Sequence, residues 1–456
     1  MTVQNWLPIM LLAASVGTPT SGATPAPNVV LIFTDDQGMN DVSCYGSEIP
    51  TPHIDSLARD GLRLTQFYAA SAICTPSRFG LLTGRNPSRS RDRLLSALMF
   101  LGDVDKRRGL RQDETTIATV LRASGYDTAL IGKWHLGHGQ AEFDARRHGF
   151  DHTYGHTAGC VDFFTLCYGN TPDWYRNGEL LDETGYATDL ITDEAVRYLG
   201  ERDPSRPFFL FIPYNAPHFG KGWDDGNNRP VNILQPHPRD LKRVKFIADP
   251  TRRKYAAKVV ALDDGIGRVL HALDANGQRE NTLVIFMTDH GGDANYGGDN
   301  RPFRAGKATL FEGGIRVPCL VRWPGKVKPG THSNEVTWAI DWFPTLCALA
   351  GAKTEGQGLD GMDISPVLHG GRLTEPRELF WELGAHTELD RGHWMALRRG
   401  PWKYVRTPQE SQWLFNLEDD PGEQQNLAGQ EPQRFERLRQ RANALRDLYR
   451  GLYTPG

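Results

Sequence analysis

The sequence predicts an α/β protein with a large mixed, mostly parallel sheet sandwiched by helices and a smaller C-terminal α+β subdomain. Three observations support this fold class. Short apolar runs alternate with helix-like stretches, glycines and prolines punctuate the joins, and the pattern changes to short antiparallel strands beyond about residue 375. With 456 residues, the chain is long enough for one large domain and a smaller one.

The apolar runs are rich in the residues typical of strands buried on both faces of a parallel sheet. They cover residues 29–33, 128–131, 208–212, 283–287 and 319–321. Two helices are predicted between them, at residues 115–123 and at residues 188–199, and Gly125 ends the first. This alternation is the pattern of a sheet covered by helices on both faces.

The C-terminal part has a different texture. Residues 394–397, 402–405 and 413–416 predict short antiparallel strands separated by turn residues. A final helix repeats apolar residues at spacings of three and four, which indicates a packing face: Phe435, Leu438, Ala442, Leu445 and Tyr449. We therefore expect a main domain over residues 24–374 and a C-terminal subdomain over residues 375–456.

The N-terminus predicts a signal peptide over residues 1–23. Residues 6–16 are an apolar run of the length of a secretory core, and Ser21, Gly22 and Ala23 offer a cleavage site with small side chains. The run is too short to span a bilayer, so we expect a secreted or periplasmic protein without stable membrane insertion. No lysine or arginine precedes the run, and a simple N-terminal extension is the alternative.

Composition excludes several other classes of protein. The hydrophobic share of 39% and the charged share of 23% are ordinary for a globular protein. A net charge of -3 gives no indication of a nucleic-acid partner. Six cysteines in 456 residues do not make a disulfide scaffold, although Cys160 and Cys167 are close enough in sequence to form a bridge.

Acidic side chains follow two of the predicted strands. Asp35 and Asp36 come after the first, and Asp289 and His290 come after the run at 283–287. Ligands gather at the carboxyl ends of strands in such sheets, and adjacent carboxylates are costly there unless a cation compensates them. Three carboxylates and one imidazole favour calcium or magnesium and leave manganese or zinc open. Taken alone, the Asp35–Asp36 pair could also be a turn cap.

Basic side chains follow the other strands. Lys133 and His135 come after the run at 128–131, His218 comes after the run at 208–212, and Lys307 precedes the run at 319–321. Cations that converge on a carboxylate-held metal form a receptor for a tetrahedral oxyanion. Each of these residues alone would more often be an ordinary surface or core residue, so the prediction depends on their shared position.

A cysteine stands in front of a predicted helix. Thr75 and Pro76 suit the N-cap and the first helical position, which would place Cys74 beside the positive end of the helix dipole. An anion is favoured at that place. The alternative is a buried cysteine that packs as a small hydrophobic residue.

Cys74, Pro76 and Arg78, with the continuing residues 81–85, resemble the signature of the type I sulfatases of the alkaline-phosphatase-like superfamily. In that family the cysteine of a Cys-x-Pro-x-Arg core is oxidised to formylglycine. The resemblance covers nearly all of the chain after residue 23. Further matching segments lie at residues 35–38, 51–55, 132–135, 216–218, 289–291 and 420–423.

The resemblance implies roles for the matching residues. One calcium ion would be held by modified residue 74 with Asp35, Asp36, Asp289 and His290. Many family members have asparagine where this chain has His290. The sulfate-binding and catalytic residues implied are Arg78, Lys133, His135, His218 and Lys307. Residues 24–374 would form the catalytic domain.

The family mechanism implies that formylglycine hydrates to a geminal diol, one oxygen of which attacks sulfur. His218 would give a proton to the leaving alcohol, and His135 would take the proton of the second hydroxyl as sulfate leaves. The resemblance also implies a formylglycine-generating maturation enzyme as a partner.

The substrate is the least specified part of the prediction. Segments 154–176, 220–239 and 386–394 carry aromatic and basic side chains that suit a sulfated sugar: Trp174, Arg176, Trp223, His237, His386 and Arg391. We therefore expect a sulfatase acting on a sulfated carbohydrate. The alternatives are an arylsulfatase, a phosphonate or phosphodiester hydrolase of the same superfamily, and a non-catalytic sugar-binding relative.

Overall fold

The structure is a computed structural model that describes residues 26–384 and 393–452. The predicted signal peptide at residues 1–23 lies outside the described residues, as do His386 and Arg391. Within the described ranges, no helix has both the length and the apolar composition needed to cross a membrane.

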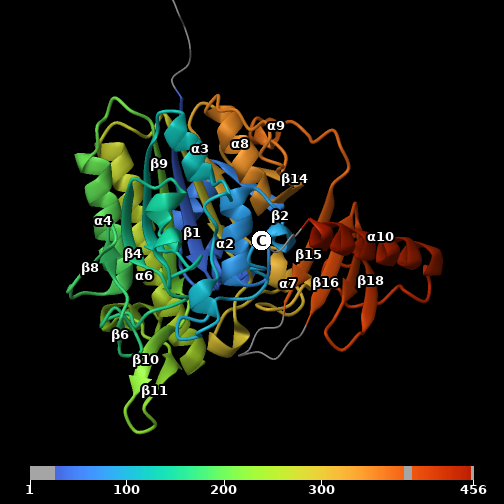
Figure 1. Cartoon of the computed structure of the whole chain (residues 1–456), viewed down its shortest axis with the longest axis horizontal. Helices are drawn as coiled ribbons and strands as arrows, with labels where there is room; N and C mark the ends of the chain where they lie inside the picture. Colours follow the sequence, from blue (N-terminus) through green and yellow to red (C-terminus); the bar gives the residue numbers. More distant parts are fainter. Residues whose placement is uncertain (1–25, 385–392, 453–456) are drawn as a thin grey trace, which may run out of the picture.

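A ten-stranded sheet organises the main domain (Figure 1). Its central strands pair in parallel, and antiparallel strands flank them on each side. In sheet order the strands are β14 (Thr331–Trp338), β2 (Leu62–Tyr68), β13 (Cys319–Arg322), β12 (Thr282–Thr288), β1 (Asn28–Asp35), β9 (Phe208–Pro217), β3 (Asp127–Lys133), β4 (His152–His156), β7 (Tyr175–Arg176) and β8 (Glu179–Leu180). All five predicted apolar runs lie in these strands, which confirms the predicted fold class.

Helices cover both faces of this sheet, because the buried strands expose apolar side chains to both sides. Leu31 and Phe33 of β1 contribute to one apolar core, and Val30 and Ile32 contribute to the other. The helices of the first face are α2 (Cys74–Thr83), α3 (Ile117–Ala123), α8 (Trp342–Leu349) and α9 (Ser365–Leu368). The helices of the second are α1 (Pro52–Arg59), α4 (Ala187–Glu201) and α6 (Pro250–Ala275) (Figure 1).

Short elements complete the connections. They are β5 (Cys167–Tyr168) paired with β6 (Thr171–Pro172), β10 (Gly220–Asp224) paired with β11 (Arg229–Ile233), and the helices α5 (Pro238–Leu241) and α7 (Glu312–Ile315). Single 3₁₀ turns lie at η1 (Met39–Asp41), η2 (Ser43–Tyr45), η3 (Pro87–Arg89), η4 (Asp105–Arg107), η5 (Ala141–Phe143), η6 (Ala145–His148), η7 (Lys242–Val244), η8 (Ala294–Tyr296) and η9 (Ala339–Asp341).

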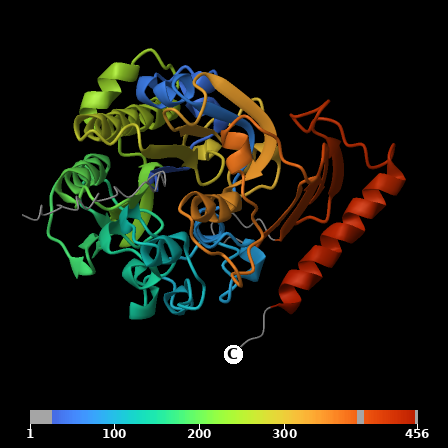
Figure 2. The ribbon, with the colours of Figure 1, turned by 90° about the horizontal axis from the view of Figure 1, so that it is seen from above.

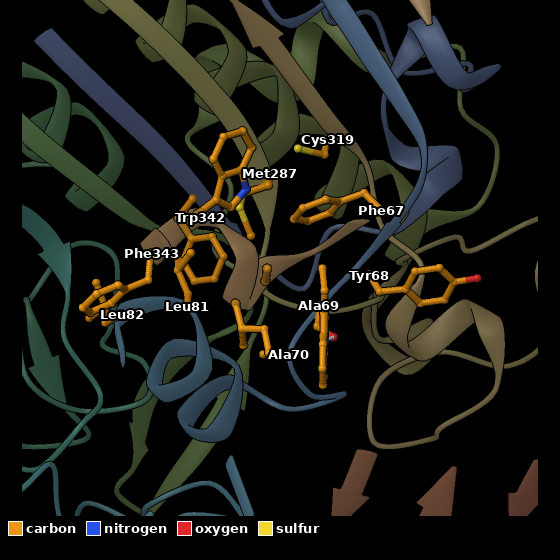
Figure 3. Close-up of a cluster of buried hydrophobic side chains, with 14 of the residues drawn as sticks. Phe67, Tyr68, Ala69, Ala70, Leu81, Leu82, Met287, Cys319, Trp342 and Phe343 are labelled. Carbon is orange, nitrogen blue, oxygen red and sulfur yellow. Dashed lines mark hydrogen bonds between the residues drawn. The ribbon is translucent and has the colours of Figure 1, made fainter. Parts of the chain in front are cut away.

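Helix α2 is buried along its whole length. Figure 3 shows Leu81 and Leu82 of this helix beside Trp342 and Phe343 of α8, in the same cluster as Met287 of β12. Packing of this kind resists even small shifts, because protein interiors are close-packed. The position of residue 74, at the first turn of α2, is therefore set by the core.

The C-terminal part forms its own antiparallel sheet of β15 (Glu378–Leu383), β16 (Trp394–Arg399), β17 (Trp402–Arg406) and β18 (Gln412–Asn416). Helix α10 (Pro432–Gly451) covers the outer face of this sheet (Figure 2). It packs through Leu438, Ala442 and Leu445, which are three of the five predicted packing positions and are buried. Phe435 and Tyr449 are partly buried in the same cluster.

A buried charge cluster joins this sheet to the main domain. Lys403 of β17 lies 2.8 Å from a carboxylate oxygen of Glu312 in α7 and 2.9 Å from one of Glu423, and all three side chains are fully buried. Burial raises the pKa of Glu423 to about 7 although Lys403 opposes the shift. Lys403 therefore compensates both carboxylates at this junction, and Arg316 lies 3.5 Å from Glu312 as a second cation.

We predict that Lys403→Met lowers the stability of the folded protein by about 3–5 kcal/mol, because it leaves the buried Glu423 carboxylate without its cation. Thermal and denaturant unfolding measure the effect. Lys353→Met removes the same charge from an exposed position and serves as the control. Equal stabilities of the two variants would contradict the account of this junction.

Candidate active site

The site lies at the carboxyl ends of the central strands. Asp35 is the last residue of β1, Lys133 is the last residue of β3, and Asp289 directly follows β12. His218 directly follows β9. Since these strands are neighbours in the sheet and run parallel, their ends meet at one edge.

Four side chains form a group that could hold a metal ion. Asp35, Cys74, Asp289 and His290 each offer one ligand atom, and these four atoms all lie within 4.8 Å of one another. Asp36 shares a second such group with Asp35 and His218. All of these residues are buried.

Two ligand atoms of this group have no hydrogen-bond partner among the described residues. They are Oδ1 of Asp35 and Nε2 of His290. The other ring nitrogen of His290, Nδ1, lies 2.9 Å from the carbonyl oxygen of Gly291. That contact assigns a proton to Nδ1, and Nε2 faces the carboxylates, with Oδ1 of Asp36 and Oδ1 of Asp289 each 3.5 Å away.

The electrostatics indicate a shortage of positive charge. Burial and the neighbouring Asp35 carboxylate raise the pKa of Asp289 to about 8. Burial alone would lower the pKa of His290, but the Asp289 carboxylate raises it to about 9. A divalent cation stabilises buried carboxylates that lie close together, and the residues present, with one unpartnered carboxylate oxygen, therefore fit such an ion.

Two lysines face the carboxylates. The Lys133 ammonium donates to Oδ2 of Asp35. The Lys307 ammonium lies 2.6 Å from Oδ1 of Asp36 and 3.1 Å from Nε2 of His218. Burial opposes the charge on Lys307, but the Asp36 carboxylate holds its pKa well above the usual range.

Arg78 lies behind the carboxylates and is fully buried. Its Nη1 donates to the carbonyl oxygen of Lys133 at 2.9 Å, and its Nη2 lies 3.5 Å from Oδ2 of both Asp35 and Asp289. The guanidinium also packs over the ring of Phe33, 5.2 Å from the ring centroid. These contacts place Arg78 as a support of the acidic cluster.

Helix α2 begins earlier than the sequence predicted. The amide of Ser77 donates to the carbonyl oxygen of Ile73 at 3.1 Å, so Ile73 is the N-cap and Cys74 is the first helical residue. The assignment of Thr75 as the N-cap was wrong. Its hydroxyl instead donates to the carbonyl oxygen of His135 at 3.2 Å, which ties the helix to the loop after β3.

Cys74 lies at the positive end of the helix dipole with cations on both sides. Burial would raise the pKa of its thiol, but the Lys133 and Lys307 ammonium groups hold that pKa well below the usual range. An anionic group at position 74 is therefore stabilised here.

His135 and His218 approach residue 74 from two different loops. Nε2 of His135 lies 2.9 Å from the carbonyl oxygen of Leu98, and its Nδ1 has no hydrogen-bond partner in the described part of the chain. Burial lowers the pKa of His135. His218 contacts the carbonyl oxygen of Phe219 through Nδ1 at 2.8 Å, so its Nε2 is free to accept from Lys307.

These residues open into a cavity of about 310 Å³. Cys74, His135, His218 and Lys307 are among the residues that line it. The remaining lining residues come mainly from loops: Ala97, Leu98, Met99, Gly159, Cys160, Tyr168, Phe219, Lys221, Asn232, Asp293, Asn295 and Tyr296.

Three of these lining residues form a hydrogen-bonded polar chain that was not predicted from the sequence. Nζ of Lys221 donates to Oδ1 of Asn232 at 2.6 Å, and Nδ2 of Asn232 donates to the Tyr296 hydroxyl at 3.0 Å. Lys221 and Asn232 belong to the segment 220–239 that we associated with the substrate, but the residues we chose in that segment were Trp223 and His237. Neither of those lines the cavity.

Two other candidates for substrate contact have structural roles. Trp174 is 1% exposed and stacks on His156 with ring centroids 6.0 Å apart. Arg176 pairs with Glu194 at 3.0 Å. Neither lines the cavity. Cys160 and Cys167 do not form a disulfide bridge in the structure.

Comparison with known proteins assigns the class. Residues 27–352 match the family profile "Sulfatase", and residues 304–448 match "N-sulphoglucosamine sulphohydrolase, C-terminal". Because the first match covers more than half of the chain, the protein belongs to the sulfatase family and is a sulfuric ester hydrolase.

Individual relatives agree with this class. The chain is 31% identical to the steryl-sulfatase of Mus musculus, over 98% of this chain and 85% of the relative. It is also 31% identical to the N-acetylgalactosamine-6-sulfatase of Canis lupus familiaris, over 91% of this chain and 84% of the relative. The crystal structure of Ps i-CgsB in complex with k-i-k-neocarrahexaose is similar with a TM-score of 0.83 and 32% identity, over 92% of this chain and 93% of that chain.

We predict that a divalent cation stabilises the native protein through this site. A chelator should lower the melting temperature of the wild type but not that of Asp289→Asn, since only the intact group holds the ion. The stabilisation is about 2.7 kcal/mol when the free ion is at 100 times its Kd. Asp225→Asn, in an exposed loop, is the control and should keep the full response to the chelator. An identical melting temperature of the wild type with and without the chelator would show that no cation is bound.

Proposed function

We propose that this protein removes sulfate from a sulfated carbohydrate, using a formylglycine made from Cys74 and a calcium ion. The observation that carries this proposal is that Cys74, His135, His218 and Lys307 line one cavity beside the acidic cluster. It combines a site for the reacting residue with cations for an oxyanion and two imidazoles for proton transfer. We also propose a formylglycine-generating enzyme as the maturation partner.

The metal ligands we propose are Asp35, Asp36, Asp289, His290 and residue 74. The dominance of oxygen ligands favours calcium over zinc. A bound calcium ion would supply the positive charge that the carboxylates lack and would polarise the sulfate group. Lys133 and Lys307 would neutralise the remaining sulfate oxygens, and Arg78 would fix the carboxylates from behind.

Formylglycine would supply a geminal diol, whose first oxygen attacks sulfur and whose second hydroxyl later drives the release of sulfate. Asp36 would take the proton of the attacking hydroxyl. Nε2 of His218 accepts from the Lys307 ammonium. After taking up a proton at that atom, from Lys307 or from solvent, His218 would pass it to the leaving alcohol. His135, with its lowered pKa and unpaired Nδ1, would take the proton of the second hydroxyl.

The lining residues that come from loops favour a sugar over an aryl or steryl group as the part of the substrate that carries the sulfate. The hydrogen-bonded chain of Lys221, Asn232 and Tyr296 offers donors and acceptors to hydroxyl groups. Phe219, whose ring centroid lies 4.4 Å from that of Tyr296, offers an apolar face to a sugar ring. A volume of about 310 Å³ is at the lower end of ligand sites and suits one sugar unit with its sulfate.

Relatives support the same substrate class. One structural neighbour was solved with a neocarrahexaose, and one curated relative is named for N-acetylgalactosamine 6-sulfate. Arylsulfatase A of Bos taurus, at 32% identity, supports an aryl ester as the second candidate. We also propose that the protein is exported to the periplasm or to the exterior of the cell.

We predict that active protein carries formylglycine at position 74. Mass spectrometry of the peptide that contains residue 74 should show the sulfur replaced by an aldehyde oxygen, in proportion to activity. Cys347, which is buried in the core, serves as an internal control and should keep its thiol. Fully active protein with only a thiol at position 74 would contradict the proposed nucleophile.

We predict that His218→Ala slows the hydrolysis of a sugar sulfate far more than that of nitrophenyl sulfate. A nitrophenolate leaves without a proton, whereas a sugar alkoxide needs one, and general-acid help is worth about 10²–10⁴-fold. Parallel measurements of kcat on both esters test this, with exposed His332→Ala as the control. Equal losses on the two esters would assign His218 to sulfate binding alone.

A further inference from the structure

A second site of positive charge lies outside the catalytic pocket, on helix α10. The helix carries six arginines and only two acidic residues, a net charge of +4 in a chain whose overall charge is -3. Charge of one sign on one short element is not required for the packing of α10, which is made by Leu438, Ala442 and Leu445. The arginines therefore call for a separate explanation.

The sheet under α10 adds to this charge. Glu378, Arg399 and Trp402 are direct cross-strand partners in β15, β16 and β17, so their side chains share one face of the sheet. This is the face that packs against α10, because Phe380, Leu397 and Tyr404, two positions further along the same strands, belong to the α10 core. Glu378, Arg399 and Trp402 form a row at one end of the sheet, beside the first half of α10.

A cavity of about 310 Å³ lies between that row and the helix, and we call it the arginine groove. Its lining residues are Arg399, Trp402, Arg434, Arg437, Leu438 and Arg441. It shares no lining residue with the catalytic pocket. No carboxylate lines it.

The arginines of the groove are partly held in place and partly free. The guanidinium of Arg434 lies over the ring of Trp402, 3.9 Å from the centroid, and Arg441 donates to Glu378 at 2.7 Å. Arg399 and Arg437 are exposed and have no ion-pair partner among residues 26–384 and 393–452. The guanidinium groups that are held in place lose little conformational entropy when a ligand binds. Those without an ion-pair partner can pair with a negative charge of the ligand.

We propose that the arginine groove binds a sulfated segment of a polysaccharide at a distance from the bond that is cleaved. This inference rests on the proposed function, which supplies the sulfated chain. Arginine forks match the geometry of tetrahedral oxyanions and bind them through two parallel hydrogen bonds. A chain that contacts both the groove and the pocket must be longer than the single sugar unit the pocket holds, so the groove selects polymers.

A sulfated sugar fits the groove better than a nucleic acid does. Arg434 covers one face of the Trp402 ring, so a base cannot stack on that face. The whole chain is also slightly acidic, with a net charge of -3, which does not favour binding to a nucleic-acid backbone.

Binding of dextran sulfate to the full chain tests the proposal, with polydeoxythymidine and anionic phospholipid vesicles as comparison ligands. The double variant Arg399→Ser/Arg437→Ser should bind dextran sulfate about tenfold more weakly and show a smaller dependence on salt. The control, Arg439→Ser/Arg446→Ser, removes two charges from α10 outside the groove and should bind like the wild type. Both variants should hydrolyse nitrophenyl sulfate at the wild-type rate.

The outcomes separate this inference from the proposed function. Unchanged binding of dextran sulfate by the groove variant, with hydrolysis intact, would overturn the arginine groove alone. Binding of polydeoxythymidine or of vesicles as tight as that of dextran sulfate, and equally lost in the groove variant, would overturn the assignment to a sulfated sugar. Groove-dependent binding of dextran sulfate without any hydrolysis of sulfate esters would support the groove and reject the proposed function.

Discussion

The compensation of buried negative charge at the end of β1 is the constraint on which the rest of the site depends. Asp35 and Asp36 stand at the centre of the sheet, and Asp289 from the neighbouring strand adds a third carboxylate. Lys133, Lys307 and Arg78 approach these groups from three other elements, each within hydrogen-bonding or ion-pair distance. Ion pairs removed from water are stable only when the geometry is held rigidly.

The fold supplies that rigidity. Parallel pairing of β1 with β12 and β9 sets the carboxylates side by side, and the two apolar cores fix the sheet from both faces. Helix α2 is buried over its full length, which presents residue 74 to the carboxylates at the positive end of a helix. Even the local backbone is adapted, since Asp36 and His135 both take positive φ values of 63° and 56°. Such conformations cost energy in residues other than glycine and tend to occur where function requires them.

The sequence predicted the part of the site that follows from strand periodicity. Apolar runs mark buried strands, and the carboxyl ends of parallel strands share one edge of the sheet. The sequence therefore predicted that four residues lie close together: Asp35, Lys133, His218 and Asp289. The start of α2 was placed too late, because the hydrogen bond from Ser77 to Ile73 has no signature in residue preferences. The loop residues that line the rest of the pocket were not predicted either, for a related reason.

Lys221 and Asn232 lie on the β10–β11 hairpin, and Tyr296 lies in η8. The residues of such connecting segments have no regular spacing, so the sequence does not predict which of them come into contact. Aromatic residues such as Trp174 looked equally suitable in the sequence, and only their burial assigns them to the core. The arginine groove likewise depends on the cross-strand partnership of Arg399 with Trp402 and on how α10 lies over it.

The central claim is that one cation holds the carboxylates of this site together with residue 74. Anomalous X-ray diffraction from crystals grown with calcium tests it most directly. The account predicts a single strong peak, with oxygen ligands from Asp35, Asp36 and Asp289 at about 2.3–2.6 Å, as is usual for calcium. A well-ordered site with no peak, its carboxylates bridged only by Lys133 and Lys307, would contradict the account.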